Sequence, residues 1–182
     1  MGDSASDAWT SVWCLRPYHP YRVFGELNPD FERATDGRLL DFKEGKGWAV
    51  AAEIAEVKKA LVHLEMPEPI HIAIVPGHEA KASNSGCPLA RVAHALAAGD
   101  ARLHADVDLI VRTTTIEKLA TGGDRSVETH LNSMRVTRRV PGVTVLVLDD
   151  VVTTGNSMAA ARQLLSDKGA AYVAGIALCQ TV

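Results

Sequence analysis

Two adjacent acids follow a run of apolar residues late in the chain, and a loop of hydroxyl residues follows the acids. The stretch VLVLDDVVTTGNSM spans residues 145–158, with Asp149 and Asp150 at its centre. Carboxylates are rarely left inside a core without a partner, so we expect this pair to face a ligand. Their oxygens suit the hydroxyl groups of a sugar, or a metal-bound polyphosphate.

The loop after the acids has the composition of a phosphate-binding site. It leads straight into a predicted helix, and a helix N-terminus favours phosphate through its free N–H groups and its dipole. Gly155 permits a close backbone approach, and Asn156 tolerates a left-handed conformation. Thr153, Thr154 and Ser157 add hydroxyl donors. A phosphate beside a diol describes a ribose 5-phosphate.

Three other interpretations of the acid pair compete with this one. A Walker B strand would need a G-x-x-x-x-G-K-[ST] segment, which the chain lacks. The acidic pocket of a receiver domain is not followed by a T-T-G turn. A plain helix cap beside solvated acids stays open on these residues alone.

The elements that must position this stretch follow from apolar spacing. Val50, Ile54, Val57 and Leu61 recur at steps of four and three, which predicts a helix. Residues 9–42 are predicted as short extended segments, among them SVWCL and RLLDF, and residues 113–133 as a long loop with a short helix around His130. The remaining predictions are strands at 70–76, 107–112, 134–137, 143–150 and 172–179, and helices at 47–65, 88–98 and 157–168.

Continuous apolar strands separated by helices are typical of a parallel sheet covered on both faces. We therefore predict an α/β fold, a single domain with a mainly parallel, doubly wound sheet. In such sheets, ligands collect beyond the carboxyl ends of the strands, where the two acids lie.

Composition narrows the class of protein. The chain has 182 residues, with 19 Lys and Arg against 22 Asp and Glu, so its formal charge is −3. This balance argues against a large nucleic-acid footprint. The sequence has no apolar run near 18 residues, so no membrane span is expected. The cysteines are three in number, far apart and without a C-x-x-C pair, which predicts free thiols in a reducing cytoplasm.

Residues 145–158 closely resemble the phosphoribosyl-pyrophosphate (PRPP) motif of the type I phosphoribosyltransferases. That motif is an apolar strand, two acids, two variable residues and T-T-G-x-[ST]. The likeness extends over roughly residues 70–182. Within the family the chain is most similar to the competence-protein F (ComF-like) branch, without its zinc ribbon, on the segments IVPGHEAKASNSG, LARVAHALA and VRTTTIEKL.

The resemblance implies a role for each matching position. Asp149 and Asp150 would bind the ribose hydroxyls and hold Mg²⁺ indirectly, through ribose or water. Lys118 and Arg125 would act as catalytic cations on a mobile loop over residues 113–130. The 5-phosphate loop would comprise Val151, Val152, Thr153, Thr154, Gly155, Asn156 and Ser157. The pyrophosphate site would comprise Pro76, Gly77, His78, Lys81 and Arg112.

The implied activity is PRPP-dependent phosphoribosyl transfer to a nitrogenous base or related acceptor, with release of pyrophosphate and Mg²⁺ as cofactor. The loop after residue 76 is less basic than in the ComF-like branch, so a non-catalytic module that senses PRPP or nucleotides is the alternative. Members of the family commonly form dimers, so a homodimer is expected.

Residues 1–45 are predicted as an N-terminal hood and residues 46–182 as the phosphoribosyltransferase core. In this family a variable hood often holds the acceptor. The aromatic residues of the hood would either stack on a base or pack a small satellite core; they are Trp13, Tyr18, Tyr21 and Phe24.

Overall fold

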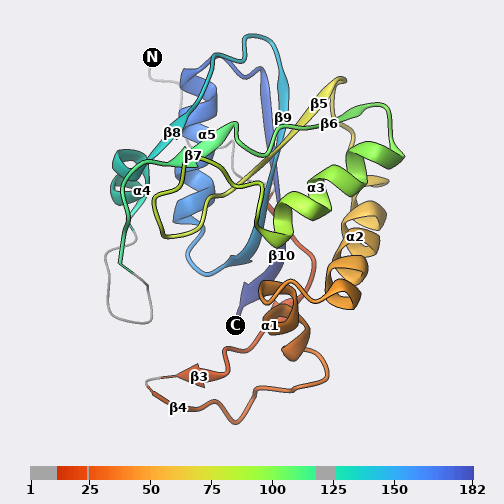
Figure 1. The fold of residues 1–182 in the computed structure, drawn as a ribbon, viewed down its shortest axis with the longest axis vertical. Coiled ribbons are helices and arrows are strands. Elements are labelled where there is room, and N and C mark those ends of the chain that lie inside the picture. Colours follow the sequence, from red (N-terminus) through yellow and green to blue (C-terminus); the bar gives the residue numbers. More distant parts are fainter. Residues whose placement is uncertain (1–11, 24, 118–125) are drawn as a thin grey trace, which may run out of the picture.

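A parallel six-stranded sheet forms the centre of the protein (Figure 1). The computed structural model describes residues 12–23, 25–117 and 126–182. The strand order is β1-β10-β9-β5-β6, and β2 pairs with the end of β10. Its strands are β1 (Val12–Cys14), β2 (Pro17–Tyr18), β5 (Ile70–Ile74), β6 (Leu103–Ala105), β9 (Thr144–Val152) and β10 (Tyr172–Thr181). The predicted α/β fold with a mainly parallel sheet is confirmed.

Helices cover both faces of this sheet (Figure 1). On one face, α1 (Gly37–Lys43), α2 (Gly47–Leu61) and α3 (Pro88–Gly99) share a core with Ile72, Leu146 and Ile176. On the other, α5 (Asn156–Asp167) shares a second core with Ala73 and Val147. Neighbouring residues of one strand thus enter different cores, which is why these strands are apolar at nearly every position.

Two small antiparallel pairs complete the fold. β3 (Arg22–Val23) pairs with β4 (Glu26–Leu27) close to α1, and β7 (Ile110–Arg112) pairs with β8 (Met134–Val136) beside α5 (Figure 1). The short helix α4 (Val127–Ser133) immediately precedes β8, and its N-cap Ser126 accepts a hydrogen bond from the backbone N–H of Thr129. After β7, the N–H of Ile116 donates a hydrogen bond to the carbonyl of His78, in the loop that follows β5.

Three predictions of local structure were wrong. RLLDF, expected to be extended, lies in α1, because Leu39 and Phe42 are spaced to bury one face of a helix. The predicted parallel strand at 107–112 is only β7, which pairs antiparallel with β8. The edge strand β6 was missed, since its three residues carry too little apolar pattern to be recognised.

The predicted hood contributes directly to the main sheet, because β1 pairs in parallel with β10. Tyr18 is buried in the core around α1 and α2, whereas Trp13 and Tyr21 are exposed. Phe24 lies outside the described residues. The division of the chain at residue 45 stays a prediction.

Across the described ranges, none of the helices has the length and apolar character that crossing a bilayer requires.

Candidate active site

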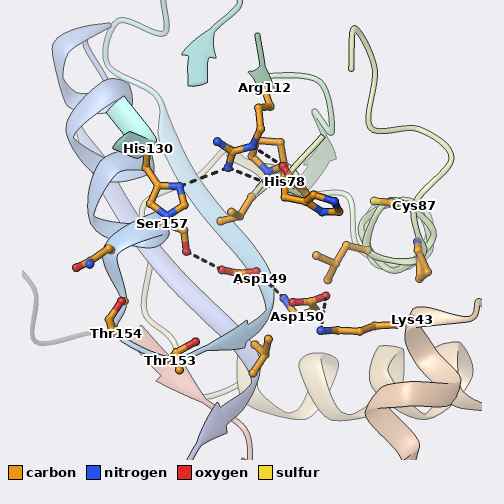
Figure 2. Close-up of a pocket in the computed structure, with 18 of the residues that line it drawn as sticks. Lys43, His78, Cys87, Arg112, His130, Asp149, Asp150, Thr153, Thr154 and Ser157 are labelled. Atoms are coloured by element: carbon orange, nitrogen blue, oxygen red, sulfur yellow. Dashed lines mark hydrogen bonds and ion pairs between the residues drawn. The ribbon is translucent and has the colours of Figure 1, made fainter. Parts of the chain in front are cut away.

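Two loops at the carboxyl edge of the sheet face one cavity. β5 and β9 are hydrogen-bonded neighbours, and the last bond of their ladder joins the Val75 N–H to the carbonyl of Leu148 over 2.8 Å. The loops that follow these strands therefore begin side by side. Together with α1 and the start of α3 they line a cavity of about 430 Å³ (Figure 2). The polar lining includes Lys43, His78, Arg112, His130, Asp149, Asp150, Thr153, Thr154, Asn156 and Ser157.

Asp149 is held on the inner side of this cavity. Its Oδ1 accepts the Asp150 N–H at 2.8 Å, and its Oδ2 accepts the Ser157 hydroxyl at 3.1 Å. Only 7% of the residue is exposed. Burial, followed by the negative charge of Asp150, raises the pKa of Asp149 to about 8. The neutral acid is therefore favoured at neutral pH.

Asp150 occupies a more open position than its neighbour. Its side chain is 32% exposed, and the ammonium nitrogen Nζ of Lys43 lies 3.4 Å from its Oδ2. Figure 2 shows Lys43 extending from α1 toward this carboxylate. The two acids thus differ in environment: one is buried and hydrogen-bonded, the other is accessible and paired with a cation.

The predicted phosphate loop lies at the start of α5. Gly155 has φ +79° and forms the N-cap of the helix, a left-handed conformation that glycine adopts without steric cost. Thr153 and Thr154 are exposed to the cavity (Figure 2). Val151 also lines the cavity, whereas the side chain of Val152 is buried in the core beside α5. Val152 could therefore contact a phosphate only through its backbone.

The predicted pyrophosphate loop is divided between two hollows. Pro76, Gly77 and His78 line the main cavity. Lys81 lines an adjoining hollow of about 270 Å³, where its Nζ lies 3.0 Å from Glu79 Oε2. Gly77 and His78 line this second hollow as well, so the role of Lys81 at pyrophosphate stays a prediction.

Arg112 connects the β7–β8 pair to this loop. It is 2% exposed; its Nε donates to the carbonyl of Gly77, and its Nη2 donates to the carbonyl of Pro76 at 3.3 Å. Its Nη1 donates to the hydroxyl of Ser133 at the end of α4. Arg112 was predicted as a cation that meets pyrophosphate. It does line the cavity, but much of its hydrogen bonding holds the protein's own backbone in place.

Lys118 and Arg125, the predicted catalytic cations, lie outside the described residues. Their role stays a prediction.

Seven lining residues were not predicted from the sequence as members of the site: Phe42, Lys43, Val75, Cys87, Pro88, Leu89 and His130. Phe42 and Lys43 lie in α1, which was misread as extended. The spacing of Leu39 and Phe42 could have predicted this helix, with Lys43 at its carbonyl end. For Cys87 and His130, nothing in the local sequence indicates that they share a cavity with Asp149.

The acid pair could hold a divalent cation only together with substrate oxygens. Among residues 12–23, 25–117 and 126–182 there is no cluster of three or more His, Cys, Asp or Glu side chains able to hold a metal ion. Mg²⁺ is usually bound by one or two carboxylates plus substrate phosphates. Two adjacent carboxylates beside a phosphate loop match that donor set.

The parallel sheet and the polar cavity at its carboxyl edge define an α/β protein with a candidate site beside the start of α5. The phosphoribosyl transferase domain family matches residues 85–181, which is more than half of the chain. The chain belongs to this family, as a type I phosphoribosyltransferase. It is therefore a transferase that acts by PRPP-dependent phosphoribosyl transfer.

Solved structures similar to this chain include three phosphoribosyltransferases of low sequence identity. The purine phosphoribosyltransferase from Pyrococcus horikoshii Ot3 is 17% identical, with TM-score 0.44 over 74% of each chain. The L. donovani hypoxanthine-guanine phosphoribosyl transferase is 17% identical, with TM-score 0.41 over 71% of this chain and 70% of that one. A hypoxanthine phosphoribosyltransferase from Staphylococcus aureus is 14% identical, with TM-score 0.40 over 72% of this chain and 62% of that one. No curated protein sequence matches the chain.

Proposed function

We propose that the enzyme transfers the phosphoribosyl group of PRPP to a nitrogenous base or related acceptor in the cavity between β5, β9 and α1. One observation carries this proposal. The acid pair, the glycine turn at the start of α5 and the Pro76–Gly77 loop line a single cavity. Diol, 5-phosphate and pyrophosphate are the three polar groups of PRPP, and this cavity offers each of them a suitable partner.

The two ends of the donor would be held by different chemistry. The accessible carboxylate of Asp150 accepts hydrogen bonds from the ribose hydroxyls. Asp149, on the inner side of the cavity, accepts a hydrogen bond from the backbone N–H of Asp150. Backbone N–H groups and hydroxyls between Val151 and Ser157 surround the 5-phosphate at the start of α5. Pro76, Gly77 and His78 face the pyrophosphate, with Lys81 at the margin.

Mg²⁺ is proposed as the cofactor, with Asp149 and Asp150 as its protein side chains, acting through ribose or water. When bound, the ion would neutralise charge on the pyrophosphate and act as a Lewis acid. The protein's own contribution is to fix the donor and to exclude water that would otherwise hydrolyse it.

The reaction breaks the bond between C1 of the ribose and the pyrophosphate oxygen, and the acceptor nitrogen forms the new bond to C1 with inversion. The electron pair of the broken bond leaves with pyrophosphate, and the acceptor nitrogen loses a proton to solvent or a nearby base. Positive charge develops on the ribose ring during this step. The negative charge of Asp150 lies close to that ring and stabilises it.

The hood over residues 1–45 is proposed to form the acceptor side of the site. Phe42, at the end of this segment, lines the cavity beside Lys43, although only 1% of the residue is exposed. The likeness of segments within residues 74–119 to the ComF-like branch supports placing the chain in that branch. A cytoplasmic homodimer is the proposed state, and light scattering of the purified protein tests the dimer.

Measuring pyrophosphate release with PRPP and a panel of purines, pyrimidines and small amides tests the acceptor. We expect release with at least one nitrogenous base, and a product that carries the base on C1. PRPP binding in a calorimetric titration, but no release with any member of the panel, would contradict the proposed acceptor class and favour a sensing module. Asp150→Asn should weaken PRPP binding; unchanged affinity would count against the site itself.

A further inference from the structure

We infer that Lys43 is a donor-positioning residue, which acts on PRPP by holding the carboxylate of Asp150 toward the cavity. This inference rests on the proposed function. The two side chains form an ion pair at 3.4 Å, although 107 positions separate them in the sequence. Lys43 also lies well before residue 85, where the family match begins. The described cavity is thus completed by a part of the chain that the family match does not include.

The backbone of Lys43 is fixed from two sides. Leu39 and Phe42 are 0% and 1% exposed and bury one face of α1 in the main core. Arg38 Nε lies 3.0 Å from Oε1 of Glu53, whose side chain is fully buried in α2. Because the helix is held by both contacts, the ammonium of its last residue reaches a defined point above β9.

Lys43 is well suited to this position, since it is the final residue of α1. The carbonyl end of a helix favours a positive charge. The next lysine along the chain pairs with other acids, because Lys46 Nζ lies 2.6 Å from Asp41 and 2.9 Å from Glu44. Figure 2 shows the side chain of Lys43 directed at Asp150 across the floor of the cavity.

The ion pair affects the donor in two ways. It limits the rotation of the Asp150 carboxylate, so that the oxygens face the place where the ribose hydroxyls would lie. It also offsets one negative charge beside a binding site for a strongly anionic substrate. Both effects act when PRPP binds rather than when the C1–oxygen bond breaks, so they should appear in KM for PRPP more than in kcat.

The test compares Lys43→Ala, Lys43→Arg and Lys43→Glu with wild type in PRPP titration and in initial-rate kinetics. A half-exposed ion pair is worth about 1 kcal/mol, so Lys43→Ala should raise Kd and KM for PRPP roughly fivefold and change kcat by less than about twofold. Arginine should restore most of the affinity, and glutamate should lower it further. The matched control is Lys59→Ala, which removes an exposed lysine that pairs with Glu56 on α2, outside the cavity lining.

A double-mutant cycle with Asp150→Asn separates action through Asp150 from direct contact with PRPP. If Lys43 acts through Asp150, adding Lys43→Ala to Asp150→Asn should produce little further loss of affinity. Independent, additive losses would overturn the inference, as would Lys43→Ala with wild-type affinity while Asp150→Asn is impaired. Thermal melts of each variant identify a folding defect. If Lys43→Ala has such a defect, the affinity of Lys43→Arg for PRPP is used to test the inference instead. Wild-type protein that binds no PRPP would refute the proposed function and this inference with it.

Discussion

The hydroxyl of Ser157 donates a hydrogen bond to Oδ2 of Asp149 over 3.1 Å, so α5 is joined by a side chain to the strand that precedes it. The other oxygen of Asp149 accepts the N–H of Asp150. These bonds stabilise the ionised carboxylate, but burial and the charge of Asp150 outweigh them and leave its pKa raised. A carboxyl group is thereby kept at the sheet edge in a form that binds a proton at neutral pH.

Replacing Asp149 with asparagine should make the empty protein more stable at pH 8. The unfolded chain releases the proton of Asp149 near pH 3.8, whereas the folded protein holds it up to about pH 8. The stability from this group is complete below the lower value and is lost as the pH rises through the higher one. Urea unfolding at pH 4, 6 and 8 measures the effect.

The gain in stability of Asp149→Asn over wild type should therefore grow with pH. Asp167→Asn, at the exposed end of α5, is the matched control and should show no such trend. A stability difference between Asp149→Asn and wild type that stays constant from pH 4 to 8 would contradict the raised pKa.

Gly155→Ala should weaken both the fold and phosphate binding. A side chain at φ +79° costs about 1 kcal/mol, because Cβ approaches the neighbouring carbonyl in this conformation. We expect the free energy of unfolding to fall by that amount and KM for PRPP to rise. Gly99→Ala, at the last residue of α3, is the control, since its φ lies outside the left-handed region and an added Cβ would meet open space. If Gly155→Ala and Gly99→Ala had equal effects, the left-handed conformation of Gly155 would not be the cause of the loss.

Arg112→Met should destabilise the protein by about 3 kcal/mol, because the change leaves the carbonyls of Pro76 and Gly77 and the hydroxyl of Ser133 without a buried donor. Chemical unfolding monitored by circular dichroism measures the loss. Arg135→Met, on the exposed side of β8, serves as the control and should cost far less. If Arg112→Met abolished PRPP binding with full stability, Arg112 would be a ligand residue alone.

Glu53→Gln should lower the free energy of unfolding by about 3 kcal/mol. Its carboxylate is fully buried and accepts both terminal nitrogens of Arg16, at 2.8 and 2.6 Å. Arg38 is close enough for an ion pair, though it is not aligned as a hydrogen bond. Glutamine would leave both arginines facing a neutral amide. The control is Glu56→Gln, on a more exposed part of α2, which should change the free energy of unfolding little. Comparable losses for Glu53→Gln and Glu56→Gln would contradict a stabilising role of the buried Glu53 cluster.

The stretch from β9 to α5 could be predicted because its signals are local. An apolar strand, two acids and a glycine turn follow one another within about 14 residues, and the structure keeps that order. The left-handed position in this turn is Gly155, one residue before Asn156, the residue predicted from the sequence to tolerate that conformation.

The partners of this stretch could not be predicted, because they come from distant parts of the chain. Nothing in the local sequence relates Lys43 to Asp150. The segment RLLDF of α1 was predicted as extended, because three apolar residues suit either a short helix or a short strand. Arg112 was expected to meet pyrophosphate, which stays a prediction, and it lines the cavity. Its burial was not foreseen, since charge alone does not indicate whether a side chain faces a ligand or the backbone of the next loop.

The pairing of β5 with β9 sets the spacing within the proposed donor site. Ile74 lies opposite Leu148, so the Pro76–Gly77 loop and the acid pair begin from one fixed register. A shift of one residue would move one loop about 3.3 Å along the other and turn its side chains to the opposite face. Backbone hydrogen bonds between the two strands, rather than side chains, therefore set the distance between the two loops of the proposed donor site.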